Sequence, residues 1–302
     1  MRMWRRPFVL VGYLCYAMVL FALFTYLKFP SHQVRAFVLT ALSHHGLEQI
    51  RIGSVQPLLP VGLTFSEVSV THDVNGQSLE LMRVPELQVQ LRTLRPFANP
   101  LRLGFAGGLY GGMVLGAVEW EHNGKGPLLG INVALQDIRP AAHPLATKLG
   151  NTLVEGKLAG NITFQLSNGR WQDGNGRLII QGEGGNLTGL DIGGARLPPL
   201  TYEQLAAELT LQQRRVVVKD FQMRGRDWQV DVQGKVSLNE PLRQSPIDLT
   251  LRVRTSEALE QQLGLIGMFL KQRRDRGGFT SLKISGTLEH PSAFCPGAGR
   301  TC

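Results

Sequence analysis

The residues that could carry chemistry in this chain are its histidines, cysteines and carboxylates, together with one glycine-rich segment. His44 and His45 are adjacent and lie near the end of a stretch with helical periodicity. Neighbours on a helix point about 100° apart, and no carboxylate or cysteine stands nearby at the spacing of a metal site. The histidine pair therefore does not indicate a metal ligand set.

Six glycines between residues 104 and 116 raise the possibility of a phosphate-binding loop. The segment contains neither G-x-x-x-x-G-K-[ST] nor G-x-G-x-x-G. No amphipathic helix follows it that could present its N-terminus to a phosphate. We therefore expect a glycine-rich hairpin that leads into a strand over Met113–Trp120, and no cofactor.

Acids and bases do not form a recognisable catalytic motif. The sequence has no G-x-S-x-G, H-E-x-x-H or C-x-x-C, and no readable Ser-His-Asp neighbourhood. The carboxylates that can be placed lie on polar strand faces or in turns, without a histidine beside a pair to relay protons. The sequence predicts that the protein is not an enzyme and has no catalytic, cofactor-binding or metal-binding residues.

The elements that would position any site begin with the apolar stretch 8–27, FVLVGYLCYAMVLFALFTYL, which contains no charged residue. As a helix it is about 30 Å long, the hydrocarbon thickness of a bilayer. Arg2, Arg5 and Arg6 precede it and predict a cytoplasmic location for residues 1–7. A cleavable signal peptide is the alternative, but its apolar core is usually roughly 7–15 residues and no small-x-small site follows here. We predict a single-pass anchor in a bacterial inner membrane, with the bulk of the chain in the periplasm.

Residues 28–49 contain the pattern of a juxtamembrane amphipathic helix. Ser31 can cap its start and Gly46 can end it. Apolar residues recur there at i, i+3, i+4, i+7 and i+8: Val34, Phe37, Val38, Ala41 and Leu42.

Residues 50–291 change to short runs of period 2, separated by glycine, proline and asparagine, which predicts a periplasmic domain of about a dozen antiparallel strands. The alternation in Gly62–Val70 changes phase between Phe65 and Val68, as a β-bulge would produce. The predicted strands include residues 86–91, 161–166, 178–180, 204–211, 216–223, 228–238, 247–253 and 282–288.

The apolar face of this predicted sheet must be covered by a second sheet, by helices or by something other than protein. A β-sandwich or a closed barrel satisfies the periodicity. The alternative is an open, curled sheet whose concave face holds phospholipid acyl chains.

A second amphipathic helix, residues 256–274, begins at Ser256 and could pack against or plug one end of the sheet. It carries Leu259, Leu263, Ile266 and Leu270 on one face. Its basic end suits either the helix dipole or contact with anionic headgroups: Lys271, Arg273, Arg274 and Arg276.

The net charge of +9 would suit nucleic acid in a cytoplasmic protein. Behind a membrane anchor the available anions are lipid headgroups and acidic polymers, so we expect no nucleic acid partner; a merely solvated basic surface is the alternative. Cys15 lies within the predicted span, and only Cys295 and Cys302, in the tail 292–302 that we predict to be flexible, could pair. The fold therefore cannot depend on disulfides.

Several stretches occur in an order typical of one family. They are KFPSHQVRAFVLTAL, IRIGSVQPLLPVGLTFSEVSV, VPELQVQLRTLRP and GGLYGG, followed by VQGKVSLNEPLRQSPIDLTLRV and KISGTLEHP. In this order they resemble the AsmA-like proteins, and more narrowly the general secretion pathway protein N family of type II secretion systems in its AsmA-related form. The similarity extends from Phe8 to about Pro291 and consists of patterns of glycine, proline and apolar alternation.

The resemblance implies an inner-membrane protein with a periplasmic AsmA-like sheet, a lipid-compatible groove and other secretion-system subunits as partners. It carries over no catalytic or metal residue. The first hypothesis is thus a component of the type II secretion system that aids protein export across the outer membrane. The second is an AsmA-like protein that carries or bridges phospholipid between the inner and outer membranes. A periplasmic enzyme is the third, although the sequence offers no cluster of titratable groups for it.

Overall fold

The protein is mainly β and is built around one large antiparallel sheet. The computed structural model describes residues 12–14, 16, 17, 20, 24, 28–44, 50–74, 77–93, 99–123, 126–142, 153–167, 174–189, 191, 192, 195–239 and 241–294.

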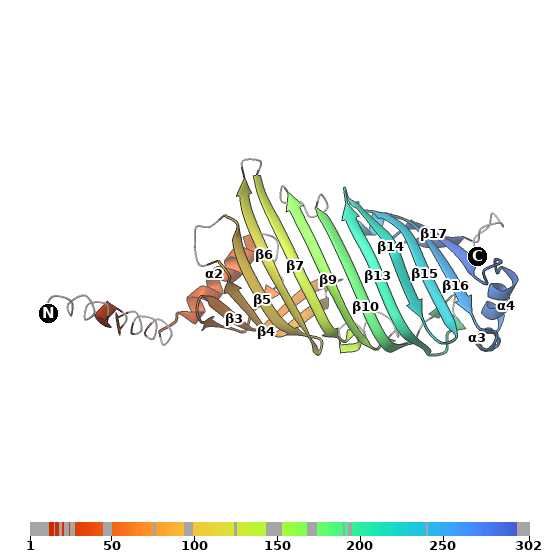
Figure 1. Ribbon diagram of the computed structural model, residues 1–302, viewed down its shortest axis with the longest axis horizontal. Coiled ribbons are helices and arrows are strands. Elements are labelled where there is room, and N and C mark those ends of the chain that lie inside the picture. Colours follow the sequence, from red (N-terminus) through yellow and green to blue (C-terminus); the bar gives the residue numbers. More distant parts are fainter. Residues whose placement is uncertain are drawn as a thin grey trace, which may run out of the picture.

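Figure 1 shows the large sheet. In the part of the chain that the structure describes, it has sixteen strands, and β11 and β12 form a separate pair. The order is β1-β3-β4-β5-β6-β7-β9-β10-β13-β14-β15-β16-β17-β18, with β2 beside β3 and β8 beside β10. The strands are β1 (Ile50–Arg51), β2 (Ser54–Leu58), β3 (Gly62–Val74), β4 (Gln77–Leu91), β5 (Leu101–Leu109), β6 (Gly112–Asn123), β7 (Gly126–Ile138), β8 (Leu153–Val154), β9 (Lys157–Ser167), β10 (Asn175–Thr188), β11 (Asp191–Ile192), β12 (Ala195–Arg196), β13 (Leu200–Gln212), β14 (Arg215–Arg224), β15 (Trp228–Ser237), β16 (Pro246–Thr255), β17 (Thr280–Thr287) and β18 (Pro291–Phe294).

The helices lie at the two ends of this sheet (Figure 1). Helix α2 (Ser31–His44) lies beside the first strands, while α3 (Glu257–Leu263) and α4 (Leu265–Gln272) lie beside the last ones. Two short 3-10 turns, η1 (Pro140–Ala142) and η3 (Leu242–Gln244), complete the described elements.

The predicted antiparallel sheet is confirmed, but the prediction that it is curled is wrong: it is an open sheet, neither closed nor curled. Its first and last strands do not pair with each other, which also excludes a closed barrel for the described strands. The reason is that alternation along a strand determines which face is apolar, whereas curvature depends on twist and bulges between strands.

Two local predictions for the strands are confirmed. The glycine-rich segment is a hairpin in which β5 and β6 pair from Leu109–Gly112 to Leu101–Trp120. In β3, Phe65 and Val68 are both buried although they are three residues apart. Glu67 between them has a φ of 52°, which shifts the phase of the strand.

The second predicted helix is not continuous, which corrects the sequence interpretation of residues 256–274. Gly264 has a φ of 57° and separates α3 from α4. A left-handed backbone is accessible to glycine at low cost, so the chain reverses there. Ser256 does cap the first helix, as predicted, because its side chain accepts a hydrogen bond from the backbone N–H of Leu259.

Several predictions fall on parts of the chain outside the described residues. No described helix is both long and apolar enough to cross a membrane. Of the predicted span 8–27, residues 12–14, 16, 17, 20 and 24 are described and are helical; the others lie outside. Residues 292–294, expected to begin the flexible tail 292–302, belong to strand β18 (Pro291–Phe294), whereas Cys295 and Cys302 lie outside the described residues.

Within the described residues, most of the buried apolar side chains belong to two clusters, one at each end of the sheet. At the α2 end, buried Val55, Phe65 and Val68 pack with Val34 and Val38 of the helix, among others. At the α3 end the buried members are Tyr202, Met223, Trp228 and Leu259. The strands between these ends contribute few buried side chains, which makes the central face of the sheet the feature to explain.

Candidate functional site

One face of the sheet carries an almost unbroken apolar row across twelve strands. Residues that are direct partners in neighbouring antiparallel strands lie on the same face. Following the pairing from β3 to β17 therefore gives one row, which contains only apolar residues and glycine: Leu63, Val89, Phe105, Gly116, Val133, Ile162, Leu178, Leu209, Val218, Gly234, Leu249 and Ile284.

A second row, displaced by two residues along the strands, has the same character. Its members are Phe65, Leu87, Gly107, Val114, Leu135, Gly160, Ile180, Ala207, Phe221, Val232, Leu251 and Leu282. We call the surface made by these two rows the apolar face. At about 4.8 Å between strands, it is roughly 50 Å wide.

Two details of the sheet keep the apolar face continuous. The ring of Phe105 lies against Gly116, where a Cβ would collide with the ring. In β14 the pairing skips a register position, so that Val218 and Phe221 pair with Gly234 and Val232. This irregularity places two residues that are three apart on the same face, which strict alternation would not do.

The opposite face of the sheet is mostly polar and carries ion pairs that are exposed or partly exposed. The Glu208 carboxylate accepts hydrogen bonds from the side chain of Arg177 at 3.1 Å and from that of Lys219 at 3.3 Å. The hydrogen bond from Arg177, followed by that from Lys219, holds the pKa of Glu208 below its ordinary value. Such exposed pairs contribute little to stability, but they identify this face as the one in water.

The central part of the apolar face is only half-buried. Along β9 the apolar side chains Leu158, Ile162 and Phe164 are half-buried, while Asn161 and Thr163 between them are exposed. Val133 on β7 and Leu178 on β10 are half-buried too. A core strand would bury these side chains under another layer, so the described protein covers this region incompletely.

At the α3–α4 end, the apolar face leads into a pocket of about 630 Å³ beneath the two helices. This volume lies within the roughly 300–1,000 Å³ typical of small-molecule sites. Phe221, Leu251 and Leu282 belong to both the apolar face and the pocket. The remaining lining residues are Leu187, Leu197, Leu200, Met223, Trp228, Val230, Val253, Thr255, Leu259, Leu263, Leu265, Ile266, Phe269 and Leu270.

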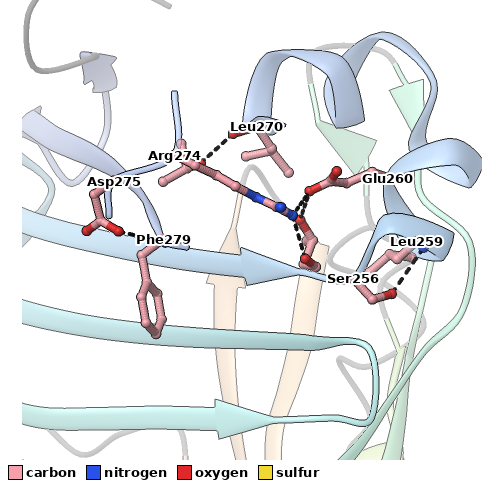
Figure 2. Close-up of polar contacts among 9 residues, drawn as sticks. Ser256, Leu259, Glu260, Leu270, Arg274, Asp275 and Phe279 are labelled. Atoms are coloured by element: carbon pink, nitrogen blue, oxygen red, sulfur yellow. Dashed lines mark hydrogen bonds and ion pairs between the residues drawn. The ribbon is translucent and has the colours of Figure 1, made fainter. Parts of the chain in front are cut away.

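The α3–α4 helices are fastened over the pocket by one polar cluster, which Figure 2 shows. Arg274 donates through Nη2 to the carbonyl of Thr255 at 2.7 Å and also forms an ion pair with Glu260. The Glu260 side chain is 6% exposed and accepts a further hydrogen bond from the Thr255 hydroxyl at 2.8 Å. Thr280 donates to the carbonyl of Leu270 at 2.7 Å. These contacts join α3 and α4 to β16 and β17.

The turn after α4 is ordered by a second carboxylate. Asp275 accepts hydrogen bonds from the backbone N–H groups of Gly277 at 2.8 Å and Phe279 at 2.9 Å. The bond from Phe279 is the main reason why the pKa of Asp275 lies below its ordinary value, and Arg252 adds to the effect. The guanidinium of Arg252 lies 4.4 Å from the centre of the Phe279 ring.

The polar groups of the large buried aromatic residues near the pocket are satisfied by backbone atoms. Tyr202 donates to the carbonyl of Glu155 at 2.8 Å, and Trp228 donates through Nε1 to the carbonyl of Thr201 at 2.9 Å. Burial raises the pKa of the Tyr202 hydroxyl. These groups therefore anchor the sheet and are not poised for acid–base chemistry.

The sequence predicted an apolar face and named Leu259, Leu263, Ile266 and Leu270, all of which line the pocket. It missed the ion pair between Glu260 and Arg274, because both residues look like solvated helix charges in the sequence. Within the described part of the chain, no three histidine, cysteine or acidic side chains gather as a metal site would require. The side chains of His44 and His45 lie outside what the structure describes.

Comparison with known proteins adds no family: no family model matches the chain, and no curated protein or solved structure matches it.

Proposed function

We propose that this chain is a non-enzymatic protein that binds lipid acyl chains on its apolar face. The observation that carries the proposal is the pair of apolar rows across twelve strands, which lead into the pocket beneath α3–α4. A flexible hydrocarbon chain suits such a surface, because the lining residues of the pocket offer almost no hydrogen-bonding side chains.

The energetics favour an occupant on this face. Apolar surface left in water costs roughly 25 cal/mol per Å², and each CH₂ group that leaves water gains about 0.8 kcal/mol. An acyl chain lying across the central strands would cover Val133, Ile162 and Leu178, which are half-buried. The competing occupant is a second copy of the chain packed face to face, and the experiment below separates the two.

We place this binding in a bacterial inner-membrane protein whose residues 8–27 form the single span. The support is the uncharged length of that stretch and the three arginines before it. The sheet would then lie in the periplasm, where phospholipid passes between the inner and outer membranes. This supports the hypothesis of an AsmA-like carrier or bridge.

A role in type II secretion is the second candidate, and the sequence resemblance favours it. The GGLYGG stretch of that resemblance forms the β5–β6 turn, with Tyr110 at a φ of 48° and Gly111 at 76°. Deleting the gene should then make exoproteins accumulate in the periplasm. Normal export would count against this role.

Site-specific photo-crosslinking in cells tests the proposed function. A photoreactive phenylalanine analogue at position 162 or 133 should capture phospholipid, which radioactive phosphate reveals on the purified full chain. The matched controls are positions 163 and 132, which neighbour them on the exposed, opposite face. Equal labelling on both faces, or no labelling, would refute the proposal. Crosslinks between two copies from position 162 would show a protein–protein interface instead.

A further inference from the structure

The α3–α4 hairpin lies at one end of the molecule (Figure 1). Its outer surface exposes large apolar side chains. Leu265 is 80% exposed and Met268 is 61% exposed. They are three residues apart in α4 and therefore lie on one side of the helix. Together with Lys271 they line a shallow cleft between α3 and α4, on the opposite side of α4 from buried Leu270.

The same end of the molecule has an excess of positive charge. Residues 252–276 contain six basic side chains and three carboxylates. Two of the carboxylates are used internally, Glu260 by Arg274 and Asp275 by Arg252. Among the described residues, exposed Lys271, Arg273 and Arg276 form no ion pair, and Glu257 is the remaining carboxylate of this region.

We propose that the tip of the α3–α4 hairpin docks on a membrane surface that contains anionic phospholipid. Exposed leucine and methionine flanked by lysine and arginine are the pattern of an interfacial helix, whose apolar residues enter the acyl boundary while its cations meet headgroup phosphates. A surface that binds another protein more often exposes aromatic hot-spot residues. The tip exposes none, because Phe269 is half-buried against the pocket beneath Arg273.

The internal contacts of the hairpin suit this role. The Glu260–Arg274 pair and the hydrogen bond from Thr280 to Leu270 hold α4 against the sheet, so Leu265 and Met268 are presented on a fixed surface. Leu265 also lines the apolar pocket. The docked tip would therefore place the mouth of the pocket at the lipid surface. The docking goes beyond the proposed function, since the tip can bind a membrane whether or not acyl chains occupy the apolar face.

Vesicle recruitment tests the proposal with the full chain. The chain is reconstituted in phosphatidylcholine nanodiscs, so that its N-terminal apolar stretch is already inserted in lipid and does not bind the added vesicles. Acceptor vesicles of phosphatidylcholine alone, or mixed equally with phosphatidylglycerol, are then added and recovered by flotation. We expect recruitment only by the mixed vesicles, with a strong decrease as salt is raised.

Two sets of variants locate the surface. Neutralising the tip with Lys271→Gln, Arg273→Gln and Arg276→Gln should weaken recruitment on the order of 100-fold. Leu265→Ser with Met268→Ser should weaken it about tenfold or more. The matched control is Arg51→Gln, Arg215→Gln and Lys235→Gln, which removes three exposed basic residues elsewhere. All of these positions are exposed, and circular dichroism checks that each variant keeps its β structure.

The outcomes separate this proposal from lipid binding on the sheet. Equal recruitment by both vesicle types, or equal losses in the tip and control variants, would overturn the docking proposal. Recruitment that needs the tip while position 162 captures no phospholipid would uphold docking and refute the proposed function. Capture of phospholipid at position 162 with no recruitment of vesicles would overturn the docking proposal and support the proposed function.

Discussion

Replacing Arg274 with methionine should release the α3–α4 hairpin from the sheet. Arg274 is the ion-pair partner of Glu260, whose side chain is 6% exposed. The Oε2 atom of that carboxylate already lacks a hydrogen-bond partner. The variant would leave a buried carboxylate with only the Thr255 hydroxyl, at a cost of roughly 3–5 kcal/mol. The methionine keeps much of the aliphatic length, so lost packing contributes less.

The matched variants make this prediction specific to charge. Glu260→Gln should cost less, because Arg274 is 27% exposed and its guanidinium can reach water. The double variant Glu260→Gln/Arg274→Met removes both charges and should recover much of the loss.

Hydrogen exchange on the full chain, read for peptides within residues 257–272, measures the local opening. A cost of about 3 kcal/mol predicts a loss of protection on the order of 100-fold for Arg274→Met. Protection equal to that of the unsubstituted chain would refute the reasoning. So would a double variant that exchanges as fast as Arg274→Met alone, because the cost would then not come from an unpaired charge.

Three further predictions follow from the same structure. Val55→Ala, at a site 2% exposed, should lower the free energy of unfolding by about 2 kcal/mol. Ile162→Ala, on the half-buried face of the lipid-free protein, should lower it by less than about 1 kcal/mol. Similar losses for the two variants in denaturant unfolding would mean that the central face is a sealed core. Thr280→Val should destabilise the protein by about 1–3 kcal/mol, because at a site 1% exposed it removes the 2.7 Å hydrogen bond to the Leu270 carbonyl and leaves that carbonyl only the longer bond, 3.4 Å, from the backbone N–H of Arg273. Thr280→Ser should be milder, and equal melting temperatures for the two variants would contradict this. The carboxyl of Asp275 should titrate below its ordinary pKa of 3.8 in carbon-detected NMR. Its contribution to stability is therefore present above pH 3.8 and is lost as the pH falls through the lowered pKa. Asp275→Asn should abolish this pH dependence, and a titration midpoint above 3.8 would contradict the prediction.

Much of the sheet was predictable because local side-chain periodicity determines it. The alternation of Leu158, Ile162 and Phe164 with exposed neighbours, and the change of phase at Phe65 and Val68, can be read in the sequence. The order of the strands follows from short connections between antiparallel neighbours.

The features that sequence reasoning missed depend on contacts between distant residues. Glu260 and Arg274 are 14 residues apart, and only the reversal at Gly264 brings them together. A glycine inside an otherwise helical pattern can be tolerated or can break the helix, and the sequence alone does not determine which of the two occurs. The open, uncurled shape of the sheet was likewise not encoded in the alternation of any single strand. Four pocket residues, Leu259, Leu263, Ile266 and Leu270, were predictable as a helix face, but the pocket was not.

Site-directed spin labelling tests the central claim most directly. The full chain, with Cys15, Cys295 and Cys302 replaced, is reconstituted in lipid and labelled singly at position 162, 133, 163 or 132. If acyl chains cover the apolar face, labels at 162 and 133 will report an apolar environment with frequent oxygen collisions and few collisions with a nickel chelate. Labels at 163 and 132 will report water. Four labels that all report water would contradict the account, and spin–spin coupling between copies at position 162 would show that a second chain covers the face.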